Sequence, residues 1–428
     1  MALIDLGELR DEPGRAVAPT RPPRTVDRPL RVALALALLV STMAAAAPVP
    51  DRTRIVVPAG PEAEAFLDGD RLYVVEQIER EPEGTVELTS YALPARRPAD
   101  DPTPAPVWRT RIPAAGRLWQ VQAGPGVVLF SVTGQQEGER TIALDAGTGQ
   151  ERWRQPGHPW WDATGILLMQ SGGEEGGSLR AVDPPSGRAR WSVPTRREGA
   201  SYSVRAGLIE RIVLATAQGR IEARDPRSGA LLHTADLPLG ELRGLGHAVV
   251  VRDLLLVNRP EVGALAAHGL DGLRQRWEVR LPPVDNVGEC GNLLCVGWAT
   301  GGIVALDPAT GVVRWTVRGW AGVLSARGGR LLAFGSGDRF GVLDGATGRQ
   351  VADLGVWQLM PWQDDDRLLA LRGAGDGRGV VVAELDVVAG RARARDVLPH
   401  ATSDCRGSGA RVLCRLRTGG FGVWRYGG

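Results

Sequence analysis

Short apolar runs separated by turn residues recur along most of the chain. Examples are RLYVVEQ at 71–77, VVLFSV at 127–132 and IVLATA at 212–217. Apolar runs of this length, bounded by Gly, Pro or Asp, are typical of β-strands. The pattern therefore predicts an all-β domain made of many short strands.

One turn motif follows many of these runs: two apolar residues, Asp, two further residues, Ser or Thr, Gly, three residues and Trp. We expect the Asp side chain to accept backbone N–H bonds within the turn and the Gly to supply a positive φ before the next strand. Complete copies run from Asp145 to Trp153, from Asp183 to Trp191 and from Asp307 to Trp315, whereas copies from Asp225, Asp344 and Asp386 place His233, Ala352 and Ala394 in the Trp position. The turn residues are Asp145, Gly149, Asp183, Gly187, Asp225, Gly229, Asp307, Gly311, Asp344 and Gly348.

The spacing of this motif indicates the architecture. Neighbouring copies lie 37 to 42 residues apart, and a unit of about four strands in about 40 residues is typical of a β-propeller blade. Residues 50–428 hold about nine such units, and longer first blades with a shared closing blade would reduce the number. We therefore expect eight blades, with seven or nine as alternatives. Residues 421–426 are expected to close the ring by pairing with a strand near 54–57.

The N-terminal segment has a different pattern. Residues 1–31 are polar and contain Pro, whereas residues 32–49 form an apolar run of 18 residues, long enough for a helix of about 27 Å that crosses a bilayer. Arg residues are concentrated before this run, which favours a cytoplasmic N-terminus. We expect a disordered cytoplasmic tail (1–31), a signal anchor (32–49) and an extracytoplasmic propeller (50–428) at the cell membrane. Cleavage after the small residues at 44–47 is the alternative and would give a secreted protein.

The four cysteines fall into two short hairpins. Cys290 and Cys295 bracket one Gly-containing turn, and Cys405 and Cys414 bracket another. Hairpin neighbours lie at the distance that a disulfide requires, and an exported domain meets an oxidising compartment. We predict the disulfides Cys290–Cys295 and Cys405–Cys414 in preference to a zinc site, whose ligand spacing would be shorter.

Charge and motifs narrow the possible functions. The 51 cationic residues are all Arg and are balanced by 49 acidic residues, which argues against a dedicated nucleic-acid-binding protein. The five His residues are dispersed, and no hydrolase, metalloprotease or nucleotide-binding motif occurs. The sequence therefore gives no catalytic or metal-binding residue.

The motif resembles the tryptophan-docking repeat of the pyrroloquinoline quinone (PQQ)-like β-propeller family. That family includes quinone-dependent dehydrogenases, a lipoprotein of the outer-membrane β-barrel assembly machinery and membrane-anchored actinobacterial proteins. The resemblance implies that blades are tied together by Trp108, Trp153, Trp191, Trp277 and Trp315. The adjacent cysteines and the haem motif of the dehydrogenases are missing, so we expect no cofactor, with PQQ and calcium as the alternative.

One segment departs from the repeat and offers a candidate contact surface. HPWWDATG places Trp160 and Trp161 side by side near a blade entrance, where aromatic side chains either anchor a binding partner or pack in the core. We predict a non-catalytic scaffold that binds an envelope protein or polymer. A PQQ-dependent oxidoreductase and an extracytoplasmic sensor module are the alternatives.

Overall fold

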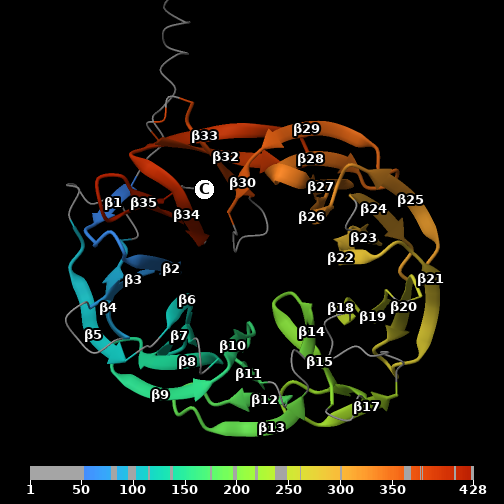
Figure 1. Cartoon of the computed structure of the whole chain (residues 1–428), viewed down its shortest axis with the longest axis horizontal. Helices are drawn as coiled ribbons and strands as arrows, with labels where there is room; N and C mark the ends of the chain where they lie inside the picture. The colour runs from blue at the N-terminus through green and yellow to red at the C-terminus, as the bar shows by residue number, and fades with distance from the viewer. Residues whose placement is uncertain are drawn as a thin grey trace, which may run out of the picture. The chain divides into compact units, whose positions relative to one another are not determined.

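The computed structural model describes residues 53–78, 84–94, 103–113, 116–134, 138–173, 176–195, 200–216, 220–236, 248–260, 262–298, 301–360, 368–375, 377, 379–408 and 411–425. They form nine four-stranded antiparallel sheets, which we number as blades 1 to 9 in chain order. The sheets follow one another around a ring, with the first strand of each blade nearest the centre (Figure 1).

The strands of the first five blades run from the innermost to the outermost in chain order. Blade 1 contains β2 (Glu64–Asp68), β3 (Arg71–Gln77), β4 (Thr85–Ala92) and β5 (Pro106–Pro113). Blade 2 contains β6 (Arg117–Gly124), β7 (Val127–Gly134), β8 (Gly138–Asp145) and β9 (Glu151–Pro156). Blade 3 contains β10 (His158–Trp161), β11 (Leu167–Gly173), β12 (Gly176–Val182) and β13 (Ala189–Thr195). Blade 4 contains β14 (Ala200–Arg205), β15 (Leu208–Ala215), β16 (Ile221–Arg224) and β17 (Leu231–Ala235). Blade 5 contains β18 (Ala248–Val251), β19 (Leu254–Arg259), β20 (Ala264–Gly269) and β21 (Gln275–Arg280).

The remaining blades follow the same order, except that the last one takes its outermost strand from the other end of the chain. Blade 6 contains β22 (Val284–Cys290), β23 (Leu293–Trp298), β24 (Gly302–Leu306) and β25 (Val313–Arg318). Blade 7 contains β26 (Gly322–Arg327), β27 (Arg330–Phe334), β28 (Arg339–Asp344) and β29 (Gln350–Val356). Blade 8 contains β30 (Gln358–Leu359), β31 (Leu369–Gly373), β32 (Gly379–Asp386) and β33 (Arg391–Pro399). Blade 9 contains β34 (Ala401–Ser408), β35 (Arg411–Leu416), β36 (Phe421–Arg425) and β1 (Thr53–Val57).

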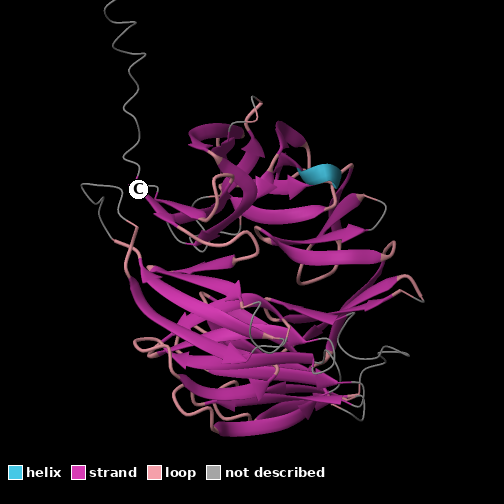
Figure 2. Ribbon diagram, turned by 60° about the vertical axis from the view of Figure 1, so that its left-hand side comes forward, coloured by secondary structure: helices cyan, strands magenta, loops and turns pink. Residues whose placement is uncertain are grey.

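Strands dominate the described residues, and their one helical element is the short 3-10 turn η1 (Ser336–Asp338) between β27 and β28 (Figure 2). No helix in these residues is long and apolar enough to cross a membrane. The predicted signal anchor at 32–49 and the predicted tail at 1–31 lie outside the described residues.

The expected closure of the ring is confirmed, but the expected number of blades is wrong. β1 pairs antiparallel with β36, so that Ile55 lies opposite Val423. The described residues form nine blades, one of the alternatives, and not eight. The closing unit supplies three strands of its own, and β1 completes that sheet without replacing a blade. In blade 1 a long segment separates β4 from β5. Because it lies between two strands of one sheet, it adds length to the chain without changing the number of sheets.

The hydrophobic core lies between neighbouring blades. Residues 127–132 of β7 are all buried, because the middle strands of a blade pack against sheets on both sides. Tyr73 of blade 1 meets Phe130 of blade 2 edge to face, with 5.7 Å between ring centroids. Burial on both faces explains why the middle strands read as continuous apolar runs and not as an alternating pattern.

Candidate functional site

The repeat turn is organised around its Asp side chain. In the turn after β24, Asp307 Oδ1 accepts the backbone N–H groups of Ala309 and Thr310 at 3.0 and 3.1 Å, and the Thr310 hydroxyl donates to it as well. Arg314 binds the other carboxylate oxygen at 2.6 Å. Hydrogen bonds from Arg314 and the turn hold the pKa of Asp307 below its usual range. The Asp residues at 145, 183, 225 and 344 accept the same kind of bonds, and their pKa values are also lowered.

The repeat turns at Asp145, Asp183, Asp225, Asp307 and Asp344 each receive a Trp from the preceding blade, whereas the turn at Asp386 meets Ala352. Trp277 of blade 5 donates its Nε1–H to the carbonyl oxygen of Pro308, next to Asp307, at 2.8 Å, and only 7% of its surface is exposed. The same bond joins Trp108 to Ala146, Trp153 to Pro184, Trp191 to Arg227 and Trp315 to Gly345. We call the interfaces between blades 1 and 2, 2 and 3, 3 and 4, 5 and 6, and 6 and 7 the docked interfaces.

The Gly of the motif allows both the positive φ of the turn and the close approach of the Trp ring. Gly311 has a φ of 71°, and a Cβ added there would lie 2.7 Å from the ring of Trp277. The corresponding Gly residues at 149, 187, 229 and 348 have φ values of 69° to 73° and lie equally close to their Trp partners. Sequence spacing alone accounts for the turn, whereas the close approach of the indole becomes visible only in three dimensions.

At the interface between blades 4 and 5, His233 stands where the docking Trp is expected and Leu273 stands where the motif Gly is expected. His233 pairs with Ala223 in the strand position that Trp occupies elsewhere. On the blade 5 side, Leu273 takes the place of the motif Gly, because its N–H bonds to the oxygen of Gly269 at 2.8 Å and its φ is 55°. Its side chain is 2% exposed and fills the core there. A cavity of about 460 Å³ lies at this interface, lined in part by His233 and Arg252.

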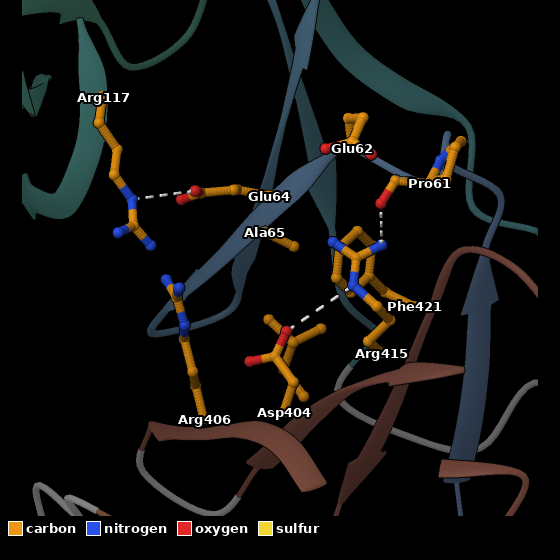
Figure 3. A pocket seen from close by; sticks show the side chains of 10 residues that line it. Pro61, Glu62, Glu64, Ala65, Arg117, Asp404, Arg406, Arg415 and Phe421 are labelled. Atoms are coloured by element: carbon orange, nitrogen blue, oxygen red, sulfur yellow. Dashed lines mark hydrogen bonds and ion pairs between the residues drawn. The ribbon is translucent and has the colours of Figure 1, made fainter. Parts of the chain in front are cut away.

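The junction between blades 9 and 1, which we call the closing junction, combines a hydrophobic cluster that includes Leu72 and Leu413 with hydrogen bonds from an arginine. Arg415 of β35 donates to the backbone oxygens of Pro61, at 3.1 Å, and Ala63. Its guanidinium lies over the ring of Phe421, 4.7 Å from the centroid, and its Nε lies 3.7 Å from Asp404. Figure 3 shows these residues around a cavity of about 240 Å³ between β2, β6 and blade 9.

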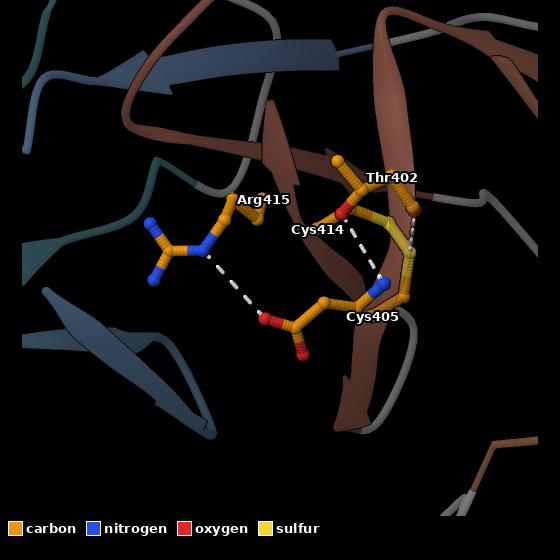
Figure 4. Close-up of a disulfide and its surroundings, with 5 residues drawn as sticks. Thr402, Cys405, Cys414 and Arg415 are labelled. Carbon is orange, nitrogen blue, oxygen red and sulfur yellow. Dashed lines mark hydrogen bonds and ion pairs between the residues drawn. A yellow bond between two sulfur atoms is a disulfide. The ribbon is translucent and has the colours of Figure 1, made fainter. Parts of the chain in front are cut away.

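Both disulfides have the pairing that the sequence predicts. Cys290 and Cys295 join β22 to β23, with Cα atoms 5.6 Å apart. Cys405 and Cys414 lie directly opposite each other on β34 and β35, with Cα atoms 4.1 Å apart. Figure 4 shows the second disulfide beside Thr402 and Arg415. The described residues contain no free cysteine.

The two tryptophans of the candidate contact surface have different surroundings. Trp160 is 42% exposed and stacks on Tyr202 of β14, with ring centroids 5.1 Å apart and planes at 28°. Trp161 is half-buried and packs in the cluster between blades 2 and 3, where its ring contacts the backbone of Gly124. The side chains of adjacent residues in a strand point to opposite faces of the sheet, so Trp160 points away from the side on which Trp161 packs.

Sequence reasoning missed two further aromatic residues on the innermost strands of the blades on either side. Trp119 on β6 is 40% exposed, and the Tyr202 hydroxyl donates to Gln170 Oε1 at 3.1 Å. Burial raises the pKa of Tyr202, so it stays a neutral donor. Trp160 and Tyr202 lie on the innermost strands of blades 3 and 4, and we call this stacked pair the aromatic surface. Only the HPWW departure from the repeat pointed to this region.

The described residues offer no assembled metal site. No group of three or more His, Cys, Asp or Glu side chains comes close enough to hold an ion within the described ranges. The acidic run at 364–366 lies outside them.

Comparison with known proteins identifies the repeat. Residues 98–244 match the family model described as outer membrane protein assembly factor BamB, and this segment includes the turns at Asp145, Asp183 and Asp225. No curated protein matches the sequence.

Solved structures resemble the chain at low identity. BamB from Moraxella catarrhalis is 17% identical, with a TM-score of 0.42, over 88% of this chain and 98% of that one. The computationally designed Ika8 protein is 14% identical, with a TM-score of 0.48, over 73% and 98%. A europium-containing methanol dehydrogenase is 12% identical, with a TM-score of 0.43, over 75% and 81%.

Proposed function

The chain is a PQQ-like repeat β-propeller, and we propose that it is a non-catalytic scaffold that binds an envelope protein or polymer outside the cytoplasmic membrane. The observation that carries this proposal is the stacked pair of Trp160 and Tyr202, which leaves 42% of a Trp exposed. Large aromatic side chains that stay accessible on a rigid support are typical anchors of binding surfaces.

The aromatic surface is organised in advance of binding. Stacking fixes the Trp160 ring against Tyr202, and Gln170 holds the Tyr202 hydroxyl. A ligand that covers these rings therefore loses little side-chain entropy at the interface. Val204, two residues after Tyr202 on β14, is 47% exposed.

The PQQ-dependent oxidoreductase is the alternative, and the residues on hand fit it poorly. Each disulfide joins cysteines five or nine residues apart, so neither forms the ring of adjacent cysteines that the dehydrogenases carry. The lack of an assembled carboxylate group among the described residues leaves no evident calcium site. Addition of PQQ and Ca²⁺ should leave the unfolding temperature unchanged, and a saturable rise would favour the oxidoreductase.

A photo-crosslinking experiment tests the scaffold proposal. A benzophenone amino acid in place of Val204 samples the aromatic surface, and the same residue at Val388, which is 62% exposed, samples a site on blade 8. We expect the first probe to give a discrete crosslinked product in intact cells and the second to give none. The product should disappear when Trp160→Ala is added and persist with Val312→Ser, an exposed apolar control on blade 6. A product that is unaffected by Trp160→Ala, or no product at all, would overturn the proposal.

A further inference from the structure

The cavity at the closing junction is lined by two arginines, each of which makes a single contact with the described part of blade 1. It is lined by residues of β2, β6 and the three C-terminal strands. Arg415 already has partners there, because it donates hydrogen bonds from blade 9 to the backbone oxygens of Pro61 and Ala63. Arg117 of β6 and Arg406 of β34 reach in from opposite sides, and Figure 3 shows their guanidinium groups pointing toward one another.

The contacts of these two arginines within the described residues leave guanidinium donors free. Among those contacts Arg117 donates from its Nε to Glu64 Oε1 at 3.3 Å, and 77% of its side chain is exposed. Arg406 lies over the ring of Phe66, 4.5 Å from the centroid. Within the described part of the chain no carboxylate forms an ion pair with Arg406. Contact with an aromatic face holds a guanidinium in place without neutralising its charge.

Three guanidinium groups and three carboxylates line the cavity, the carboxylates being those of Glu62, Glu64 and Asp404. Glu64 pairs with Arg117 and Asp404 lies beside Arg415, so within the described residues the guanidinium of Arg406 has no carboxylate partner. Like charges that face each other at short range repel unless an anion lies between them. Arginine donors in a planar fork match the two oxygens of a carboxylate or phosphate.

We propose that Arg117 and Arg406 form a binding site for an oxyanion, either a carboxylate or a phosphate, carried by a small ligand or by the end of a larger one. The cavity of about 240 Å³ is smaller than typical pockets for drug-sized molecules, so it suits a single anionic group. The site is separate from the aromatic surface, and it stands whether or not the scaffold proposal does.

The second disulfide supports the wall of this site. Cys405 lies between Asp404 and Arg406, and Cys414 lies between Leu413 and Arg415. All four neighbours line the cavity, and the disulfide links the two strands that carry them. The link therefore keeps Arg406 and Arg415 in a fixed relation across the β34–β35 pair.

Isothermal titration of the full-length chain with inorganic phosphate and, separately, with acetate tests the proposal. We expect saturable binding of at least one anion, weakened at least tenfold by Arg406→Gln and by Arg117→Gln. Arg314→Gln removes an exposed arginine from a blade 6 turn and should leave binding unchanged, as should Trp160→Ala. Binding of phosphate alone or of acetate alone would support the site and identify its ligand class.

Two results would overturn the proposal. One is the absence of saturable binding of either anion to the wild-type chain at low ionic strength. The other is an equal loss of binding in Arg314→Gln, which would mean that the anion binds to general surface charge. If Arg406→Gln lowers the unfolding temperature, Arg406→Lys provides the second variant, because it keeps the charge and loses the fork. Arg406→Lys should bind more weakly than wild type and more tightly than Arg406→Gln, and wild-type affinity in this variant would contradict a role for the fork.

Discussion

The docked interfaces and the closing junction join neighbouring blades in different ways. At a docked interface one buried indole lies on the next turn, as Trp277 lies on Gly311, and donates one bond to a backbone oxygen. At the closing junction Arg415 donates to two backbone oxygens across the gap, and a polar cavity remains beside it. The comparison indicates that the repeat motif fills a docked interface with a buried indole, whereas the closing junction keeps a cavity lined by charged side chains.

The largest expected effect separates a docking Trp from an exposed one. Trp277→Ala removes a 7% exposed side chain and its hydrogen bond, and it should lower the free energy of unfolding by about 3–5 kcal/mol. Trp160→Ala, at a 42% exposed site, should change it by less than about 1 kcal/mol. Urea unfolding followed by Trp fluorescence measures both. Equal losses in the two variants would contradict the structural role assigned to the dock.

The disulfide of the closing blade should have the next largest effect. Replacing Cys405 and Cys414 by Ser opens a link between residues nine apart and should cost about 2–3 kcal/mol. The matched control replaces Cys290 and Cys295, which lie in blade 6 between docked interfaces, and should cost a similar amount. Phosphate and acetate titration distinguishes the two disulfides, because only the double variant at Cys405 and Cys414 should weaken anion binding. Loss of binding in both would indicate a general effect of destabilisation.

The interface between blades 4 and 5 can be converted into a docked one. His233→Trp alone should destabilise the protein, because Leu273 fills the space that the indole needs. Leu273→Gly alone should also destabilise it, because a buried side chain is lost. The double variant restores a Trp and a Gly, so the two changes should offset each other by at least about 1 kcal/mol in a double-mutant cycle. Additive effects would show that the two positions do not meet.

The smallest expected effect concerns pH and the turn carboxylates. The pKa of Asp307 is lowered from its ordinary 3.8, first by its hydrogen bond with Arg314. Because the folded-state pKa lies below the unfolded one, the resulting stability is complete above about pH 4 and is lost as the pH falls through the folded-state pKa. The unfolding temperature of Asp307→Asn should therefore depend less on pH below about 4 than that of the wild type. Identical pH profiles would rule out the carboxylate as a source of acid sensitivity.

The sequence predicts the repeated parts of this protein well because they depend on local chemistry. The turn from Asp307 to Trp315 is recognisable in nine consecutive letters, and hairpin spacing alone predicts Cys405–Cys414. The blade count is harder to predict, because the closing blade combines β1 with three strands from the other end of the chain. No local pattern shows whether such a unit replaces a blade or adds one.

The candidate sites are less accessible to sequence reasoning because they join distant residues. Trp160 stands out by departing from the repeat, whereas its partner Tyr202 lies in an ordinary strand sequence. Arg117 and Arg406 meet only because the ring brings blade 9 next to blades 1 and 2. In a chain whose 51 cationic residues are all Arg, neither of them carries a signal of its own.

The most direct test of the central claim, that a stable ring presents a separate binding surface, is the yield of crosslinked product from the probe at Val204 with and without Trp160→Ala. The yield is normalised to the amount of folded protein in the cells. We predict that Trp160→Ala abolishes the product while the unfolding temperature stays at the wild-type value. An unchanged yield at unchanged stability would contradict the assignment of the aromatic surface as the binding site.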